Sequence, residues 1–343
     1  MAGSGFFISI QYLRAVAAIL VVLFHITAIF PGALPLFDAG QAGVDIFFVI
    51  SGLVMWLTGR QAGAGSFMLR RILRIVPLYW AVTLFAALIS FSGGLSVGID
   101  VPLVDLIRSL TFIAYENPGA TPPVSPIVGP GWTLNLEMFF YLLFALALAW
   151  ARVWLVPVMV LGLVGLALLG ASLAPLGPVA GFYLQDIIVE FALGILLGRW
   201  ITGGAWFPGA GLSGLILVAG LIWIFAGVMP SEYRLIGWGV GAVLIVTGVV
   251  GLESFLARAP QLWLKLLGDA SYAIYLVHVI TIGIVGRVWN GLGLTSGGLS
   301  DLVILAICLL AGITVHLLFE KPVGRVLRHW AGRGAGSHKP RID

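Results

Sequence analysis

The stretch FFISIQYLRAVAAILVVLFHITAIF, residues 6–30, decides the fold class. It is apolar and long enough to cross a membrane, which takes about 20 residues in a helix. It nevertheless carries Arg14 and His25, which a rise of 1.5 Å per residue places about 16 Å apart. Ionisable groups in lipid cost roughly 2.5–3.5 kcal/mol, so they usually face a protein interior and mark a site. We therefore expect one helix to carry a fixed cation near one membrane face and a proton-transfer group near the other.

The composition extends this interpretation to the whole chain. The sequence is 60% hydrophobic and 9% charged, with a mean hydropathy of +1.11, whereas soluble domains carry about 25% charged residues. The net charge of +4 comes from cations in short loops and at the C-terminus, a pattern of membrane topology that argues against nucleic-acid binding. The lone Cys308 cannot form an intrachain disulfide, and no metal site is predicted. No basic stretch precedes the first apolar run, which we interpret as a retained helix.

Ten apolar stretches are candidate membrane spans, and they predict an all-α polytopic membrane protein with a bundle of about ten transmembrane helices. The longest connection, 92–130, contains PGATPPVSPIVGPG, which cannot continue a helix. The segment 253–267 is amphipathic, and we expect it to lie at the interface without spanning. We expect one membrane domain, 1–325, followed by a basic tail, 326–343. The ten spans are 6–30, 43–59, 70–91, 131–150, 153–173, 179–200, 209–228, 235–252, 268–290 and 300–320.

The cation distribution predicts the orientation. If the N-terminus is inside, 15 of the 18 Lys and Arg residues fall on the inner side, and only Arg108, Arg234 and Arg287 fall outside. The positive-inside rule then makes both termini cytoplasmic. Tryptophans that include Trp150 and Trp200 fall near the predicted inner ends of spans, where interfacial aromatic residues are common.

This topology sorts the polar residues by depth, and it places His25, Asp45 and Glu137 together in the outer half of the membrane. A carboxylate near His25 would orient the imidazole and stabilise its protonated form. Two simpler readings stay open. His25 could be a structural histidine bonded to a carbonyl, and Asp45 could cap the start of its helix, where an anion is favoured. Glu137 lies too far inside its span to be a cap.

A second group shares the inner half: Arg14 with Arg70, Arg71 and Arg74 of the motif RRILRIVPLYW. Spacings of three and four residues allow one helix face to present several guanidiniums. The planar guanidinium fork suits phosphate, which it binds by two charge-assisted hydrogen bonds. Arg70 and Arg71 could also be ordinary topology anchors. For Glu190, His278 and His316, packing or polar contact between helices is the favoured reading.

Together these residues form motifs that resemble the acyltransferase-3 family of membrane acyltransferases, and within it the bacterial exopolysaccharide acetyltransferases. The resemblance implies an enzyme of the bacterial inner membrane that passes an acyl group, acetyl by preference, from cytoplasmic acyl-CoA to an extracytoplasmic hydroxyl. The acceptor implied is a polysaccharide or a lipid-linked glycan. The matching segments are IQYLRAVAAILVVLFH (10–25), GVDIFFVISGLVM (43–55), RRILRIVPLYW (70–80), WTLNLEMFFY (132–141), ASYAIYLVH (270–278) and FEKPVGR (319–325).

The same resemblance implies roles for single residues. His25 corresponds to the catalytic histidine, Arg71 and Arg74 to a pair of arginines, and Glu137 to a motif carboxylate. The chemistry of the donor agrees with these roles, because CoA carries phosphates at one end and a thioester at the other. Its extended arm is comparable in length to the Arg14–His25 separation.

Several alternatives remain open from the sequence. The chain could instead be a transporter or flippase for a glycolipid or acidic solute, since buried charges and interrupted helices also suit transport. It could also be a passive anchor in a polysaccharide assembly. Within the enzyme reading, His25 could be a general base or a nucleophile that forms acyl-histidine. The oxyanion donors stay open among Ser51, Tyr141 and backbone amides.

Overall fold

The computed structural model describes residues 7–29, 35–91, 102–118, 120–173, 176–204, 206–227, 234–294 and 297–335. Within these residues the regular elements are helices, and the only extended pairing is one bridge between Glu116 and Val124. The α-helices are α1 (Ile8–Ile29), α2 (Ala42–Gly59), α3 (Ala64–Phe91), α4 (Leu103–Leu110), α5 (Trp132–Trp150), α6 (Leu155–Ser172), α7 (Pro178–Tyr183), α8 (Val189–Thr202), α9 (Ala210–Phe225), α10 (Val240–Gly251), α11 (Glu253–Leu256), α12 (Leu262–Gly291), α13 (Gly298–Val315) and α14 (Lys321–Ala335). Shorter helical turns are η1 (Pro35–Gln41), η2 (Gly129–Gly131), η3 (Arg152–Trp154), η4 (Asp186–Ile188), η5 (Leu235–Gly239) and η6 (His316–Glu320).

The all-α polytopic class is confirmed. Eight helical segments of the described chain are long and apolar enough to cross a membrane. The 22 residues of α1, for example, extend about 33 Å, against a hydrocarbon core of about 30 Å. Two of the ten expected spans, 209–228 and 235–252, form the shorter apolar helices Ala210–Phe225 and Leu235–Gly251. Both begin or end next to glycine-rich sequence, which limits their length.

The expected span 179–200 is confirmed as the candidate span Pro178–Thr202, with an internal break, and two other expected boundaries were wrong. The span expected at 179–200 is broken after Tyr183 and continues as η4 and α8. The segment 253–267 is only partly separate, because α12 begins at Leu262, directly after Pro260 and Gln261. The last span continues through η6 and α14 to Ala335, so the expected tail begins as helix, while 336–343 lies outside the described residues. Pro322 lies inside this continuous helix, directly after the π-helical turn η6, and such a turn lets a helix pass a proline with a local distortion instead of an end.

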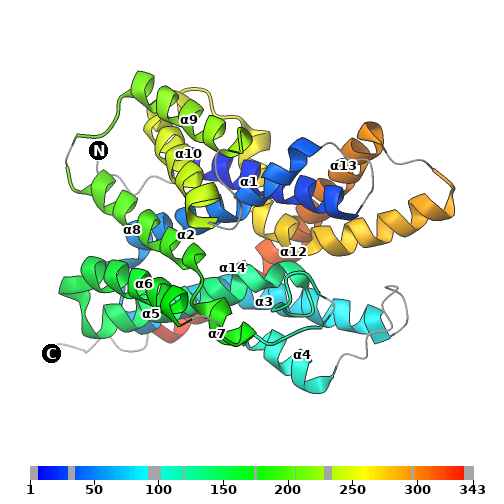
Figure 1. The fold of residues 1–343 in the computed structure, drawn as a ribbon. Helices are drawn as coiled ribbons and strands as arrows, with labels where there is room; N and C mark the ends of the chain where they lie inside the picture. The colour runs from blue at the N-terminus through cyan, green and yellow to red at the C-terminus, as the bar shows by residue number, and fades with distance from the viewer. Residues whose placement is uncertain are drawn as a thin grey trace.

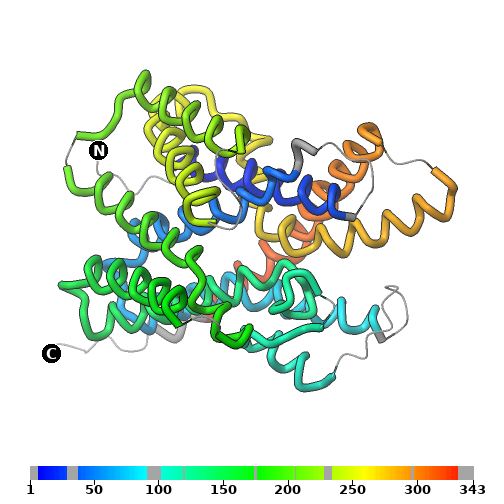
Figure 2. Tube along the Cα trace, viewed as in Figure 1, coloured from blue at the N-terminus to red at the C-terminus, as the bar shows by residue number. Residues whose placement is uncertain are grey.

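The helices form an upper and a lower group in the view of Figure 1. Figure 1 shows α1, α9, α10 and α13 in the upper part of the view and α3, α4, α5 and α6 in the lower part. The most extensive helix pairs are α2 with α8, α1 with α12, and α9 with α10. Figure 2 shows α1, in blue, beside the orange α13, and the two helices are in contact. The start of α1, the end of α2 and the start of α3 therefore meet at one end of the bundle, as alternating spans require.

The backbones of α2 and α8 approach closely, and two glycines permit it. A Cβ atom on Gly52 would lie 2.1 Å from the carbonyl oxygen of Phe191, and one on Gly194 would lie 2.1 Å from that of Val49. Small residues let helix backbones approach closely in membranes, where dispersion contacts drive association. Next to this contact, the Phe191 ring stacks between Phe48 at 4.5 Å and Phe140 at 4.3 Å, which joins α2, α5 and α8.

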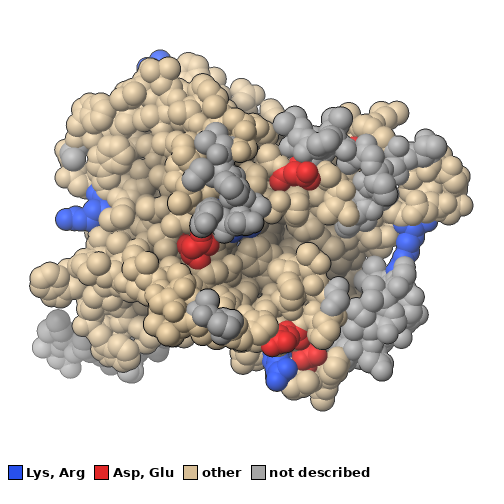
Figure 3. Space-filling model, viewed as in Figure 1, with Lys and Arg blue, Asp and Glu red and all other residues tan. Residues whose placement is uncertain are grey.

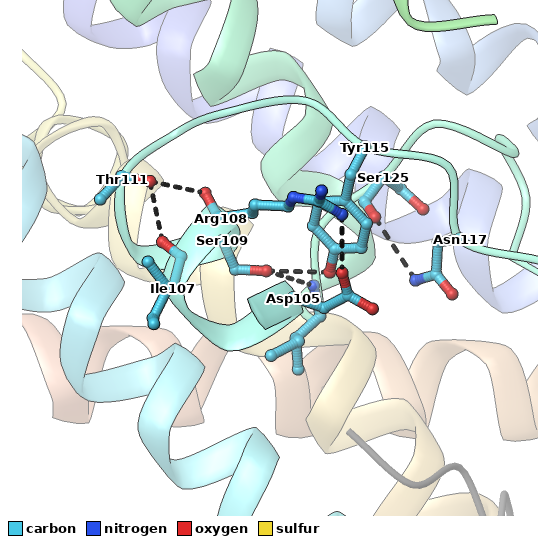
Figure 4. Close-up of polar contacts among 9 residues, drawn as sticks. Asp105, Ile107, Arg108, Ser109, Thr111, Tyr115, Asn117 and Ser125 are labelled. Carbon is cyan, nitrogen blue, oxygen red and sulfur yellow. Dashed lines mark hydrogen bonds and ion pairs between the residues drawn. The ribbon is translucent and has the colours of Figure 1, made fainter. Parts of the chain in front are cut away.

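The connection between α3 and α5 is held by local polar contacts, shown in Figure 4. Ser109 is the centre of these contacts: its Oγ lies 3.0 Å from the hydroxyl of Tyr115 and accepts a hydrogen bond from the amide of Ile127 at 3.1 Å. Burial raises the pKa of the Tyr115 hydroxyl, which therefore stays protonated. Asp105 and Arg108 form an ion pair at 3.2 Å on the same short helix, α4. Beyond the short helix α4, side-chain hydrogen bonds therefore hold most of the described part of this connection in place.

The outer surface fits a protein embedded in lipid. Figure 3 shows a face with few Lys, Arg, Asp or Glu side chains. Large apolar side chains are exposed along helices that would contact lipid, among them Leu84 and Leu88 of α3 and Leu161 and Leu168 of α6. In a soluble protein such exposure would indicate an interaction surface, but here it is the expected lipid-facing surface.

We predict that Gly194→Ala lowers the free energy of unfolding by about 1–3 kcal/mol, the usual cost of overpacking. The physical reason is that the added methyl would collide with the Val49 backbone, which cannot move away without separating α2 from α8. Gly165→Ala in α6 is the matched control, because a Cβ there meets nothing within 4 Å. Thermal unfolding of detergent-purified protein, followed by tryptophan fluorescence, measures both. Equal midpoints for the two variants would contradict the packing described here.

Candidate active site

A cavity of about 460 Å³ opens among α1, α2, α3, α5 and α12. Its wall is mostly apolar, with a limited number of polar groups, as is typical of small-molecule sites. Four of the seven residues singled out from the sequence line it: Arg14, Arg71, Arg74 and Glu137. The other polar residues of the wall are Gln11, Ser51, Thr58, Thr133, Tyr141, Ser271, Tyr272 and Tyr275.

The arginines gather at one end of this cavity. Arg71 is buried, and its Nη2 donates a hydrogen bond to Thr58 Oγ1 at 3.3 Å. Its guanidinium lies 5.6 Å from the ring centroid of Phe67 and 5.9 Å from that of Tyr141. Arg74, one turn further along α3, lines the cavity with an exposed side chain. Since these groups share a cavity wall with Arg14 of α1, three guanidiniums face one space.

Arg70 does not join this group. Its side chain is exposed and is absent from the cavity wall. A helix turns by 100° per residue, so adjacent residues such as Arg70 and Arg71 point in different directions, and only one of them faces the bundle.

Glu137 is the carboxylate of the cavity wall. Ser51 Oγ donates a hydrogen bond to Glu137 Oε1 at 2.8 Å, and the hydroxyl of Tyr141 donates to the same oxygen. The two donors come from α2 and from the next turn of α5, so the carboxylate is fixed from two sides. Glu137 also interacts electrostatically with Arg14 and Arg71. The cavity therefore holds three cations against one carboxylate, which leaves it suited to an anionic ligand.

His25 lies outside the cavity wall and contacts a second histidine. Its Nδ1 lies 2.9 Å from the carbonyl oxygen of Val21, and its ring meets that of His278 edge to face, with centroids 4.7 Å apart. His278 is fully buried, and its Nδ1 lies 2.6 Å from the carbonyl oxygen of Tyr275. A carbonyl only accepts, so each Nδ1 carries the proton and each Nε2 keeps a lone pair. The Nε2 of His278 has no hydrogen-bond partner within the described chain.

Tyr275 links the cavity wall to the histidine pair. It lines the cavity, and its ring centroid lies 5.8 Å from that of His278. Its hydroxyl donates to the carbonyl of Pro130 at 2.9 Å and lies 2.7 Å from Thr133 Oγ1. The tyrosine is therefore tied to the loop that precedes α5.

Asp45 has a different partner from the one expected. Its Oδ2 forms an ion pair with Arg234 at 2.8 Å, and Asp45 itself is fully buried. The buried Glu190 of α8 also interacts electrostatically with Asp45. Asp45 stands in the first turn of α2, as the capping reading required, but its direct contact is with an arginine of another helix. The structure thus joins Asp45 to Arg234, while the ring of His25 is held by Val21 and His278.

Sequence reasoning did not single out Arg234 or His278 as partners, although the depth argument could have done so for Arg234. Arg234 was one of three cations on the outer side, the side that also held Asp45. His278 lies at the middle of its predicted span, 268–290, deeper than His25 in its own. Among the described residues no group of three or more His, Cys, Asp or Glu side chains is arranged to hold a metal ion.

Comparison with known proteins identifies the family. Residues 7–320 match the family model named "acyltransferase domain". The chain belongs to this acyltransferase family. It is 34% identical over 310 residues to the exopolysaccharide production protein ExoZ of Rhizobium meliloti (strain 1021), covering 86% of this chain and 94% of that protein. It is 29% identical over 335 residues to the acyltransferase MdmB of Streptomyces mycarofaciens, covering 84% and 82% of the two chains. No solved structure gives a significant match.

Family membership favours the enzyme over the transporter and the passive anchor. The acyltransferase is a multi-pass membrane protein whose cavity matches the family motifs in position: the motif residues Arg14, Arg71, Arg74 and Glu137 converge on it.

We predict that His278→Leu lowers the rate of acyl transfer by on the order of 10–100-fold, as displaced catalytic groups do. Leucine keeps the apolar volume but removes the ring that contacts His25. A double-mutant comparison checks the coupling: in a His25→Ala background, His278→Leu should cause no further loss. If His278 only packs, the leucine variant will transfer as wild type does. Unfolding temperatures of both variants serve as the control for general damage.

Proposed function

We propose that this acyltransferase transfers an acetyl group from acyl-CoA to a hydroxyl of a polysaccharide or lipid-linked glycan across the bacterial inner membrane. The observation that carries the proposal is the convergence of Arg14, Arg71 and Arg74 on one cavity whose wall is mostly apolar. Phosphates of the donor suit these arginines, because guanidiniums bind phosphate by paired charge-assisted hydrogen bonds. The apolar remainder of the cavity suits the thioester arm. The name of the Rhizobium relative, an exopolysaccharide production protein, supports a polysaccharide acceptor.

The donor enters from the cytoplasm in this proposal. Acyl-CoA is a cytoplasmic metabolite, and most of the cations of the chain fall on the side that holds the arginine end. Both termini are then cytoplasmic, and the acceptor meets the opposite side of the bundle, where His25 lies near the far end of α1.

The proposed chemistry is a general-base reaction. His25 Nε2, which has its lone pair free while Nδ1 is bonded to Val21, takes the proton of the acceptor hydroxyl. The hydroxyl oxygen attacks the thioester carbon, the carbon–sulfur bond breaks, and CoA leaves as a thiolate that is then protonated. Glu137 holds the hydroxyls of Ser51 and Tyr141 beside the cavity. Each hydroxyl has one proton, so we propose that one of them turns from Glu137 and donates to the oxyanion as it forms. Asp45 is proposed to belong to the outer part of the site, where it forms an ion pair with Arg234.

We predict that His25→Ala lowers acyl transfer by about 10²–10⁴-fold, the usual cost of losing a general base. The purified protein in vesicles is supplied with labelled acetyl-CoA and candidate glycans, and mass spectrometry locates the label. Thr27→Ala is the matched control, because Thr27 makes the same kind of bond on α1, from Oγ1 to the carbonyl of Leu23. A His25 variant within about threefold of the wild-type rate would remove this residue from the mechanism.

We predict that Arg71→Gln weakens acyl-CoA binding by about 1–3 kcal/mol, as expected for a lost charge-assisted bond. Arg71→Lys should restore binding only in part, since lysine keeps the charge but lacks the planar fork. Arg70→Gln is the control: it removes the same charge at the neighbouring position, outside the cavity. Calorimetry with purified protein measures all three. Equal losses for Arg70 and Arg71 would show that only the overall charge matters and would contradict the proposed donor site.

A further inference from the structure

A second, separate pocket of about 330 Å³ lies where the ends of α2 and α8 meet the start of α6. Its wall includes Trp56 and Arg60 from α2 and its C-terminal end, Arg152 from η3, and Arg199 from α8. No residue of this wall lines the larger cavity. The pocket therefore does not belong to the candidate active site, and neither the motifs nor the proposed reaction use it.

The charges of this pocket are unbalanced. Three guanidiniums share its wall, and the wall contains no aspartate or glutamate. None of the ion pairs found among the described residues involves Arg60, Arg152 or Arg199. Like charges that converge without a counter-charge repel one another, and the repulsion is stronger near lipid than in bulk water. An anion in the pocket would remove this repulsion.

Existing contacts hold the arginines in place before any ligand binds. The guanidinium carbons of Arg60 and Arg199 lie 5.0 Å and 6.0 Å from the ring centroid of Trp56. The Trp56 ring is itself fixed, because its Nε1 donates to Thr202 Oγ1 at 2.8 Å. Arg152 donates to the carbonyl of Ala62 at 2.5 Å, which leaves its remaining donors available. Such fixed arginines lose little side-chain entropy when an anion binds.

The pocket lies at the level expected for lipid headgroups. Trp150 and Trp154, which flank the Arg152 turn, are 81% and 67% exposed, and Val153 is 91% exposed. Exposed tryptophans mixed with arginines at the ends of spanning helices are typical of the membrane interface. The end of α2 that forms the pocket is also the end that carries Thr58, so the pocket is at the same membrane face as the arginine end of the active-site cavity.

We propose that this pocket binds the phosphate of an anionic phospholipid. Three guanidiniums and an indole suit a phosphodiester with an apolar body, and the exposed apolar residues beside them can contact the acyl chains. A bound lipid would join the ends of α2 and α8 to the start of α6. The lipid therefore stabilises the glycine-packed α2–α8 pair, independently of the acyl donor and acceptor.

The test uses the full chain purified in uncharged detergent and titrated with phosphatidylglycerol, phosphatidylcholine or inorganic phosphate. Phosphatidylglycerol should raise the unfolding temperature in a saturable manner, since a ligand that binds only the folded state stabilises it. Phosphatidylcholine should have little effect. A shift of the same size with inorganic phosphate alone would overturn the assignment to a lipid.

The variant Arg60→Gln/Arg199→Gln should weaken the apparent affinity for phosphatidylglycerol about tenfold or more, the effect expected for lost charge-assisted bonds. Arg152 is kept in this variant because it also supports the turn after α2. The control is Arg325→Gln/Arg328→Gln, which removes two exposed charges of α14, outside the pocket. Equal weakening in the two variants, or an unchanged affinity in the pocket variant, would overturn the proposal. Native mass spectrometry of retained lipid gives a second readout if the pocket variant has a lower unfolding temperature without ligand.

Discussion

The cost of placing charge in lipid governs the rest of this structure. A bundle with so few charged residues can carry them across its spans only where they face each other or a shared cavity. Glu137 takes hydrogen bonds from Ser51 and Tyr141 and faces the arginines of the cavity, while Asp45 takes an ion pair from Arg234. Each polar group thereby fixes the rotation of its helix, because a small rotation would turn the charge toward lipid. The same constraint, the cost of charge in lipid, therefore governs both the polar contacts of the site and the packing of the bundle.

Much of the architecture was accessible from the sequence because the bilayer sets helix length and the cations report topology. The inner group of Arg14, Arg71 and Arg74 was predicted together, and the structure brings these residues to one cavity. Depth along a helix axis follows from counting residues. The direction in which each side chain points around that axis depends on neighbouring helices, and single-sequence counting does not contain this information.

That distinction accounts for what was missed. Arg70 and Arg71 have nearly the same depth, yet only Arg71 faces the cavity. Asp45 and His25 have similar depths, yet they face different neighbours, Arg234 and His278. The extension of the last span through Pro322 was missed for another reason: a π-helical turn precedes the proline and lets the helix continue, and the sequence pattern does not show such a turn.

The position of Tyr275 has a consequence for the membrane itself. Its side chain lines the cavity, lies next to His278 and is anchored to Pro130 and Thr133. A continuous aqueous path from one membrane face to the other would conduct protons and dissipate the gradient that powers the cell. With an aromatic wall in that position, the two halves of the site need not be open to water at the same time. Under the proposed function, this arrangement lets acyl transfer across the membrane take place without a path for protons.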